Sequence, residues 1–258
     1  MSADGIHISI TPEPIANFNL FGLGNFDLTN SMFSTLIVTI LLCIFAIAAG
    51  GIMRKQGKPS KFQNSIEWLY EFVENLSGDN LGSISKARKY IGLTITLFLF
   101  ILLGSWFGLL PGVMHLTTFF DGVEVPLLRA PTTDLNFTIA LSLIAFLVIQ
   151  YSGFAALGFG YLGKFFTFRG GPMGFLIGLL ELVSELSRLL SFSFRLFGNI
   201  FAGEVLLVIL FYFTKSIWFP APTLVILMET FVAMIQAYVF VSLMSLFISL
   251  ATTPHDEH

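Results

Sequence analysis

Residues 174–214 read GFLIGLLELVSELSRLLSFSFRLFGNIFAGEVLLVILFYFT, a largely apolar helical pattern that no proline interrupts. One helix of these 41 residues would be about 60 Å long, twice the ~30 Å hydrocarbon core of a membrane. The simplest prediction is a single, strongly tilted helix. A break near Gly198 or Gly203, which would give two steep spans, is the alternative. Five charged residues lie inside this stretch, namely Glu181, Glu185, Arg188, Arg195 and Glu204.

The last apolar stretch, residues 223–253, repeats this pattern over 31 residues. It contains neither glycine nor proline, and Glu229 is its only charged residue. The segment 215–222 between the two stretches holds Lys215 and two prolines, so it is expected to form a turn. We therefore predict a hairpin of two long, tilted helices.

The composition is that of a membrane protein. Apolar residues make up 55% of the chain and charged residues only 11%, and the mean hydropathy is +0.84. A soluble domain needs about a quarter of its residues charged. The net charge of −3, without a basic block, excludes a general nucleic-acid binder. The single cysteine, Cys43, lies in an apolar run and is expected to be a packing residue.

Three further stretches lack charged residues and exceed the ~20 residues that a membrane helix needs, namely 28–53, 90–120 and 135–163. Together with the hairpin they predict an all-α membrane protein with three steep transmembrane helices. The predicted segments are an external N-terminal segment 1–30, a transmembrane helix 31–53, a cytoplasmic loop 54–89, a transmembrane helix 90–111, an external loop 112–133, a transmembrane helix 134–158, a cytoplasmic loop 159–173, the tilted helices 174–214 and 223–253 with the external turn 215–222, and a cytoplasmic tail 254–258.

The orientation follows from the basic residues in the loops. Seven of them lie between the first and second spans, whereas the loop 112–133 has only Arg129. Because basic residues gather in cytoplasmic loops, the first loop is expected inside and the N-terminus outside. Without an Arg-rich transit peptide, and with an acidic tail, we expect a multi-pass protein of the bacterial plasma (inner) membrane. The mitochondrial inner membrane is the alternative.

One loop contains an amphipathic pattern. Over residues 62–76, apolar side chains recur at helical spacing opposite Glu67, Glu71 and Glu74. This pattern predicts a helix that either lies on the membrane surface as an interfacial helix or forms the docking site of a partner. The sequence does not choose between the two.

The charged residues of the stretch 174–214 share one face of the predicted helix. From Glu181, the offsets are 4 to Glu185, 7 to Arg188, 14 to Arg195 and 18 to Asn199, all close to multiples of 3.6. Ionisable groups are costly inside a membrane and usually mark a protein interior or an ion path. The hydroxyls beside this polar stripe, which could carry a chain of waters, are those of Ser184, Ser187 and Ser191. For Glu185 and Arg188, a purely structural ion pair at three residues' spacing is the alternative.

Arg195 is harder to explain as a structural residue. No carboxylate lies three or four residues away on either side, so its partner is expected on another chain. Ser191, Gly198 and Ala202 are small residues beside it, and they would allow a neighbouring helix to approach closely. A guanidinium stays protonated, so it attracts a carboxylate without donating a proton to it.

These motifs resemble a known family. SFRLFGNIFAGE at 193–204, IQAYVF at 235–240 and PTTDLN at 131–136 are similar to segments of the a subunit of rotary F-type ATP synthases. The resemblance runs over about residues 30–252 in the family's order and spacing. It implies two long, nearly horizontal helices that curve around a ring of c subunits.

The resemblance also implies roles for individual residues. Arg195 matches the essential arginine that faces the ring carboxylate. The matches to the outer half-channel are Asn199, Glu204, Glu229 and Gln236, and the matches to the inner one are Glu181, Ser184 and Ser191. Glu185 and Arg188 are supporting candidates. Residue 229 departs from family members that have histidine there, so Glu204 and Glu229 would form a pair of like charges.

The implied function is that of a stator subunit. Protons would enter through the outer half-channel, ride on the ring, and leave through the inner half-channel, so that proton flow drives rotation and ATP synthesis. The implied partners are the c ring, b-type peripheral stalk subunits and the lipid bilayer, within the multi-subunit ATP synthase. The sequence has no Gly-rich Lys-Ser/Thr loop, so we expect no nucleotide site, and we expect no cofactor and no metal.

Two other classes of function stay open from the residues alone. A secondary transporter also places charges at mid-membrane, but it usually has two related halves. Here no matching set of charges precedes residue 165. A purely structural membrane scaffold would not need an arginine without a partner beside small residues.

Overall fold

The computed structural model describes residues 12–19, 25–54, 60–110, 116–120, 123–163, 172–213 and 220–253. It is mostly helical, which confirms the predicted all-α membrane protein. Five of its helices are long and apolar enough to span a membrane. They are α1 (Asn30–Met53), α3 (Ile84–Leu109), α4 (Leu135–Leu157), α6 (Pro172–Phe213) and α7 (Pro220–Thr252).

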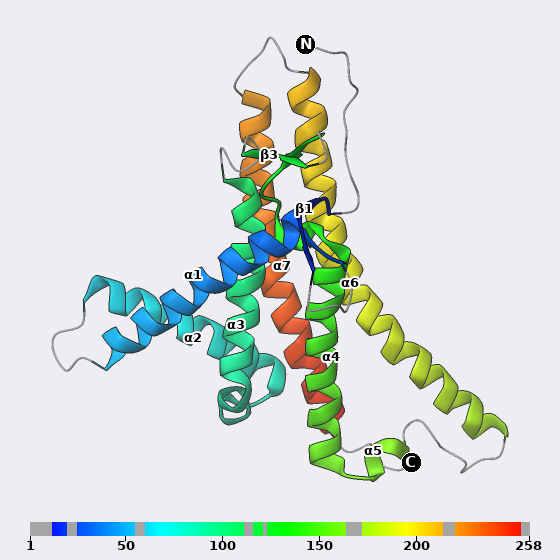
Figure 1. Cartoon of the computed structure of the whole chain (residues 1–258). Coiled ribbons are helices and arrows are strands. Elements are labelled where there is room, and N and C mark those ends of the chain that lie inside the picture. The colour runs from blue at the N-terminus through cyan, green and yellow to red at the C-terminus, as the bar shows by residue number, and fades with distance from the viewer. Residues whose placement is uncertain are drawn as a thin grey trace.

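The two longest helices pair in one half of the molecule and separate in the other. Figure 1 shows α6 and α7 side by side near the top of the view, while the lower part of α6 runs away obliquely. The helix α6 is continuous over 42 residues and passes through Gly198 and Gly203. The helix is therefore single and continuous, without a break at either glycine, and its strong tilt in the membrane stays a prediction.

The core lies where α3, α4, α6 and α7 meet. Its fully buried side chains include Ile101 of α3, Leu196 of α6 and Phe240 of α7. Phe192 of α6 packs edge-on against Phe240 with ring centroids 5.0 Å apart. The apolar faces of these helices thus bury one another and hold the polar groups of α6 and α7 in fixed positions.

The helix α2 (Lys61–Leu81) lies where the sequence predicts an amphipathic helix over residues 62–76. It ends at Gly82, whose φ of 69° is the left-handed conformation that glycine adopts easily. Val73 and Leu76 are buried against α3 and α7, whereas Phe62 and Trp68 are exposed. Part of the apolar face therefore packs inside this chain, which neither predicted role for the helix included.

Two small hairpins were not predicted from the sequence. Strands β1 (Pro14–Asn19) and β2 (Asn25–Thr29) pair antiparallel before α1. Strands β3 (Thr117–Phe120) and β4 (Val123–Pro126) pair antiparallel between α3 and the short 3₁₀ helix η2 (Pro131–Thr133). A single turn, α5 (Gly160–Gly163), follows α4.

Local sequence explains where α1 and α4 begin. The hydroxyl of Thr29 accepts a hydrogen bond from the backbone N–H of Met32, at 3.3 Å. The carboxylate of Asp134 accepts one from the backbone N–H of Asn136, at 2.9 Å. Both side chains satisfy amide groups that the first turn of a helix leaves without partners. These caps fix the start of each helix next to the segment 126–133.

Gly108 allows the segment before η2 to pack closely on α3. A methyl group at this position would overlap Cβ of Ala130 and lie 3.2 Å from its Cα. We expect Gly108→Ala to lower stability by about 1–3 kcal/mol, because the backbone of Ala130 must move. The control is Gly92→Ala in the same helix, where the added methyl group meets no atom within 4 Å. Equal thermal unfolding midpoints for the two purified variants would contradict this expectation.

Candidate functional site

Arg195 lies near the middle of α6, and its side chain is half-buried. Its Nη2 donates a hydrogen bond to the Oγ of Ser191, at 3.3 Å. Across the parts of the chain that the structure describes, no carboxylate lies within salt-bridge distance of this guanidinium. Phe194 and Leu190 beside it are exposed. Arg195 is thus a cation at the edge of an exposed apolar face.

Asn199 and Gln236 join the two long helices one turn further along α6. Nδ2 of Asn199 donates a hydrogen bond to Oε1 of Gln236, at 2.8 Å. Gln236 is only 3% exposed. Its Nε2 has no hydrogen-bond partner among the described residues, although it is buried. A buried amide in this situation is a place where water binds.

Glu229 of α7 reaches across to α6 and occupies the space above a glycine. Its side chain is buried, with 2% of the residue exposed. A Cβ atom on Gly203 would overlap both carboxylate oxygens of Glu229. Glycine at residue 203 is therefore what allows the carboxylate of Glu229 to lie between the helices.

A small cavity adjoins this carboxylate. Its volume is about 30 Å³, and a single water needs at least about 10–15 Å³ by the same measure. The residues that line it come from α3, the segment 128–133, α6 and α7, and its polar and charged members are Ser105, Arg129, Thr133, Glu204 and Glu229. Residues distant in sequence thus meet at one point between the helices that has room for water.

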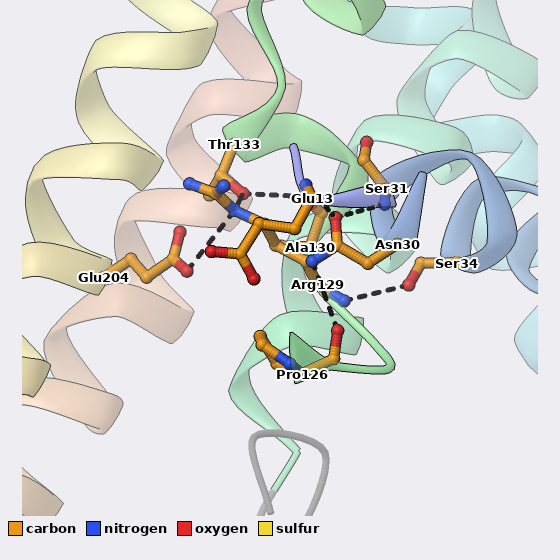
Figure 2. A network of polar contacts seen from close by, with 9 residues as sticks. All are labelled: Glu13, Asn30, Ser31, Ser34, Pro126, Arg129, Ala130, Thr133 and Glu204. Atoms are coloured by element: carbon orange, nitrogen blue, oxygen red, sulfur yellow. Dashed lines mark hydrogen bonds and ion pairs between the residues drawn. The ribbon is translucent and has the colours of Figure 1, made fainter. Parts of the chain in front are cut away.

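Arg129 reaches Glu204 at this cavity. Its Nε lies 3.5 Å from Oε1 of Glu204 and donates a hydrogen bond to Oγ1 of Thr133, at 3.0 Å. Figure 2 shows both contacts. The sequence predicts Glu204 and Glu229 as a pair of like charges. This prediction of two like charges is incomplete, because Arg129, a buried residue of the segment between β4 and η2, lies beside Glu204.

A second polar cluster lies nearer the start of α6. Arg188 pairs with Glu185 at 2.8 Å and with Glu181 at 3.9 Å. Oε2 of Glu185 accepts a hydrogen bond from Nε2 of Gln150 on α4, at 3.1 Å, and Tyr161 donates to Oε1 of Gln150, at 2.6 Å. The guanidinium of Arg188 also lies over the ring of Phe247.

Tyr161 lies in α5, beyond the end of α4. Burial, reinforced by the negative charge of Glu185, raises the pKa of its hydroxyl to about 12. The phenol is therefore protonated at physiological pH and acts as a hydrogen-bond donor. Its ring fills the space beside Gly153, where a Cβ would lie 2.5 Å from a ring carbon.

The structure groups the residues that the sequence selects. Asn199 contacts Gln236 directly, Glu204 and Glu229 share the cavity, and Ser191 contacts Arg195. Glu181 and Glu185 are paired with Arg188, and Ser184 is half-buried on the same helix. For Glu185 and Arg188, the sequence left a purely structural ion pair as the alternative, and the structure contains this ion pair.

Three residues of these clusters were missed by reasoning from the sequence, namely Arg129, Gln150 and Tyr161. Arg129 was used only to orient the loops, although it is the only Lys or Arg in the segment 112–133. Gln150 is a lone amide near the end of an apolar span. An isolated arginine in a loop and an isolated amide in an apolar span each indicate a polar group that needs a partner, but the sequence does not indicate which residue that partner is.

The long apolar helices define an integral membrane protein. Carboxylates, amides and arginines lie between these helices, as in the class of membrane proteins whose ionisable groups line an ion path. The sequence pattern of the family described as "ATP synthase A chain" matches residues 32–249. Over two thirds of the chain lies in this match, so the chain belongs to this family. The resemblance found in the sequence is thereby confirmed, and the chain is part of the membrane sector of an F-type ATP synthase, a complex of many subunits.

Individual relatives agree with the family. ATP synthase subunit a of Gloeobacter violaceus is 33% identical over 226 residues, covering 87% of this chain and 85% of the relative. Subunit a of a Sulfurihydrogenibium species is 33% identical, covering 86% of this chain and 94% of the relative. Subunit a of Campylobacter jejuni is also 33% identical, with coverages of 86% and 89%.

Proposed function

We propose that this chain is the stator subunit that provides two offset proton half-channels against a rotating ring of c subunits. The observation that carries the proposal is the position of Arg195. It is a permanent cation within a membrane helix, and among the described residues its side chain donates a hydrogen bond only to the hydroxyl of Ser191. A charge in such a position is costly unless a partner of opposite charge approaches it.

The partner that fits this position is a carboxylate on the c ring. Large apolar side chains are exposed on α6 and α7, as expected for a face that meets another membrane helix, and they include Leu186, Leu190, Phe194, Phe231 and Ile235. The exposed polar residues nearest to Arg195 along α6 are Ser191 and Asn199. A ring carboxylate that is ionised would be attracted to Arg195. Once protonated, it would be neutral and could face lipid as the ring turns.

The outer half-channel of the proposal runs along the cavity and the amide pair. Glu229 and Glu204 line the cavity. Asn199 lies between it and Arg195 along α6 and donates a hydrogen bond to Gln236 of α7. Glu204 is nine residues beyond Arg195, which corresponds to about 14 Å along a helix. Water in the cavity could pass a proton from one carboxylate to the next and on to the ring.

The inner half-channel of the proposal lies on the other side of Arg195. Glu181 is 14 residues before Arg195, or about 21 Å along the helix. Ser184 and Ser191 lie between them and supply hydroxyls. Glu185 and Arg188 support this side by pairing with each other. The charge of Arg195 would separate the two paths, because it opposes the direct passage of a proton.

Rotation follows from the offset between the two paths. A proton that enters from outside must ride on the ring almost a full turn before it reaches the inner path. Each proton that crosses 100 mV releases about 2.3 kcal/mol, so several are needed for each ATP. We place the chain in the bacterial plasma membrane, in contact with b-type peripheral stalk subunits. Two of its relatives, from Gloeobacter and Campylobacter, are bacterial.

Cysteine labelling tests whether these paths are wet. In a Cys43→Ser background, we expect Asn199→Cys and Gln236→Cys to react with water-soluble thiol reagents applied from outside. Because only the thiolate reacts and a thiol facing lipid stays protonated, both should react at least about tenfold faster than Ala140→Cys. Ala140 is exposed on α4 and serves as the lipid-facing control.

The side of entry is part of the same test. Ser184→Cys should react preferentially with reagent added from the cytoplasmic side. Similar rates at residues 140, 199 and 236 would contradict the proposed outer path, and faster labelling of residue 199 from inside would contradict its orientation.

A further inference from the structure

Arg129 connects the beginning of the chain to the outer cluster. It lies between β4 and η2, and the residue is only 8% exposed. Its side chain contacts Thr133 and Glu204, as described above. Its backbone N–H donates a hydrogen bond to the Oγ of Ser34 on α1, at 3.0 Å. One residue thus contacts α1, η2 and α6.

The neighbouring asparagine holds the same segment. Nδ2 of Asn30 donates a hydrogen bond to the carbonyl of Pro126, at 3.2 Å. Oδ1 of Asn30 accepts hydrogen bonds from the backbone N–H groups of Ser31, at 2.8 Å, and Glu13, at 3.3 Å. Asn30 and Ser34 are both buried. Figure 2 shows these contacts converging on the segment from Pro126 to Thr133.

The two carboxylates of the cavity have different surroundings. Arg129, Glu204 and Glu229 are the charged residues that line it, one each from the loop, α6 and α7. Glu204 has Arg129 beside it. Among the described residues no cation lies within salt-bridge distance of Glu229, which is packed against Gly203.

A buried charge is stable only next to an opposite charge. The guanidinium of Arg129 stays protonated, so it attracts the nearer carboxylate, that of Glu204, and holds it at the cavity. Glu229 has no such partner among the described residues.

We propose that Arg129 is a positioning residue of the outer path, held by Ser34 and Asn30, which pairs with Glu204 and so leaves Glu229 as the carboxylate that exchanges protons with the water of the cavity. This inference rests on the proposed proton path and adds a direction to it. Water delivers a proton to Glu229, whose own proton moves inward towards Gln236 and Asn199. Glu204 and Arg129 provide a fixed ion pair beside that transfer.

The test compares Arg129→Gln with Arg129→Lys in the complete ATP synthase. Proton uptake driven by a membrane potential is measured in sealed vesicles as a function of external pH. Removing the cation removes the charge that attracts the carboxylate of Glu204, so the uptake profile of Arg129→Gln should move to higher pH by about one unit. At a fixed neutral pH this corresponds to about tenfold slower uptake. Arg129→Lys keeps a charge and should restore the wild-type profile at a lower rate.

A double variant separates this role from a merely structural one. In Arg129→Gln with Glu204→Gln, the second change should cause no further loss, because the ion pair between the two residues is already lost in the single variant. Ser34→Ala should shift the profile in the same direction by a smaller amount. Arg88→Gln is the control, because it also removes an arginine–glutamate pair, but one whose arginine is exposed, belongs to α3 and does not line the cavity.

The inference is overturned if Arg129→Gln lowers uptake equally at every external pH, or if the losses in the double variant add. It is also overturned if Arg129→Lys has the same profile as Arg129→Gln. The proposed function is judged separately by the labelling of residues 199 and 236. If those positions are wet from outside while Arg129→Gln is unshifted, only the role of Arg129 fails.

Discussion

An enzyme with Arg195→Gln or Arg195→Ala is expected to assemble in the membrane and to lose proton-driven ATP synthesis almost completely. Among the described residues no carboxylate lies within salt-bridge distance of the guanidinium, so its removal leaves none of them with an unpaired buried charge. The helix should therefore keep its packing through Leu196 and Phe192, which lie in the core. What is lost is the charge that separates the two paths and attracts the ring carboxylate.

The size of the effect follows from electrostatics in a poorly solvated site. Losing at least about 2 kcal/mol of charge interaction slows a step at least about thirtyfold. Arg195→Lys should also be poor, because an ammonium deprotonates more readily when buried and lacks the planar fork of arginine. ATP synthesis by inverted vesicles is measured beside the amount of assembled complex. Coupled ATP synthesis above a few per cent of the wild-type rate in Arg195→Gln or Arg195→Ala would contradict the role proposed for Arg195.

Gly203→Ala is expected to have the second largest effect. The added methyl group would overlap the carboxylate of Glu229, which must then leave its place between α6 and α7. Displacing a buried side chain by overpacking costs about 1–3 kcal/mol. Because Glu229 lines the cavity of the proposed outer path, we expect proton uptake to fall about tenfold or more.

A shorter side chain provides the matched rescue. Gly203→Ala combined with Glu229→Asp should recover part of the lost uptake, because aspartate retracts the carboxylate by one methylene group. Gly92→Ala, which adds a methyl group in open space, is the control for the general effect of alanine in a helix. The steric account fails if uptake in Gly203→Ala matches that in Gly92→Ala, or if Glu229→Asp deepens the loss.

The membrane class of the fold was predictable because it depends on the apolar composition of the chain and on the helical spacing of its polar residues. Apolar stretches without charges predict membrane helices wherever they occur, and no knowledge of packing is needed. The polar stripe of α6 was visible for the same reason, since residues 181–199 follow the helical repeat. The continuity of α6 through Gly198 and Gly203 was not decided by sequence, because glycine in a membrane helix is compatible with both outcomes.

The contacts between helices were beyond reach of the sequence alone. Nothing local indicates that Arg129 meets Glu204, because the residues lie 75 positions apart in different types of structure. The segment 126–133 has no periodicity from which its direction could be inferred. The two β-hairpins were missed for a similar reason, since strands of four to six residues carry little pattern. Tertiary packing, rather than local preference, determines these parts.

The network at Asn30 and Ser34 has a consequence for the order of biosynthesis. Ser34 and Arg129 are 95 residues apart, and a ribosome adding about 5–20 residues per second needs about 5–20 seconds to cover that distance. Glu204 emerges later still. During this interval the first turns of α1 expose polar groups whose final partners have not yet been made. The nascent chain must therefore hold α1 in a provisional position until the later helices arrive.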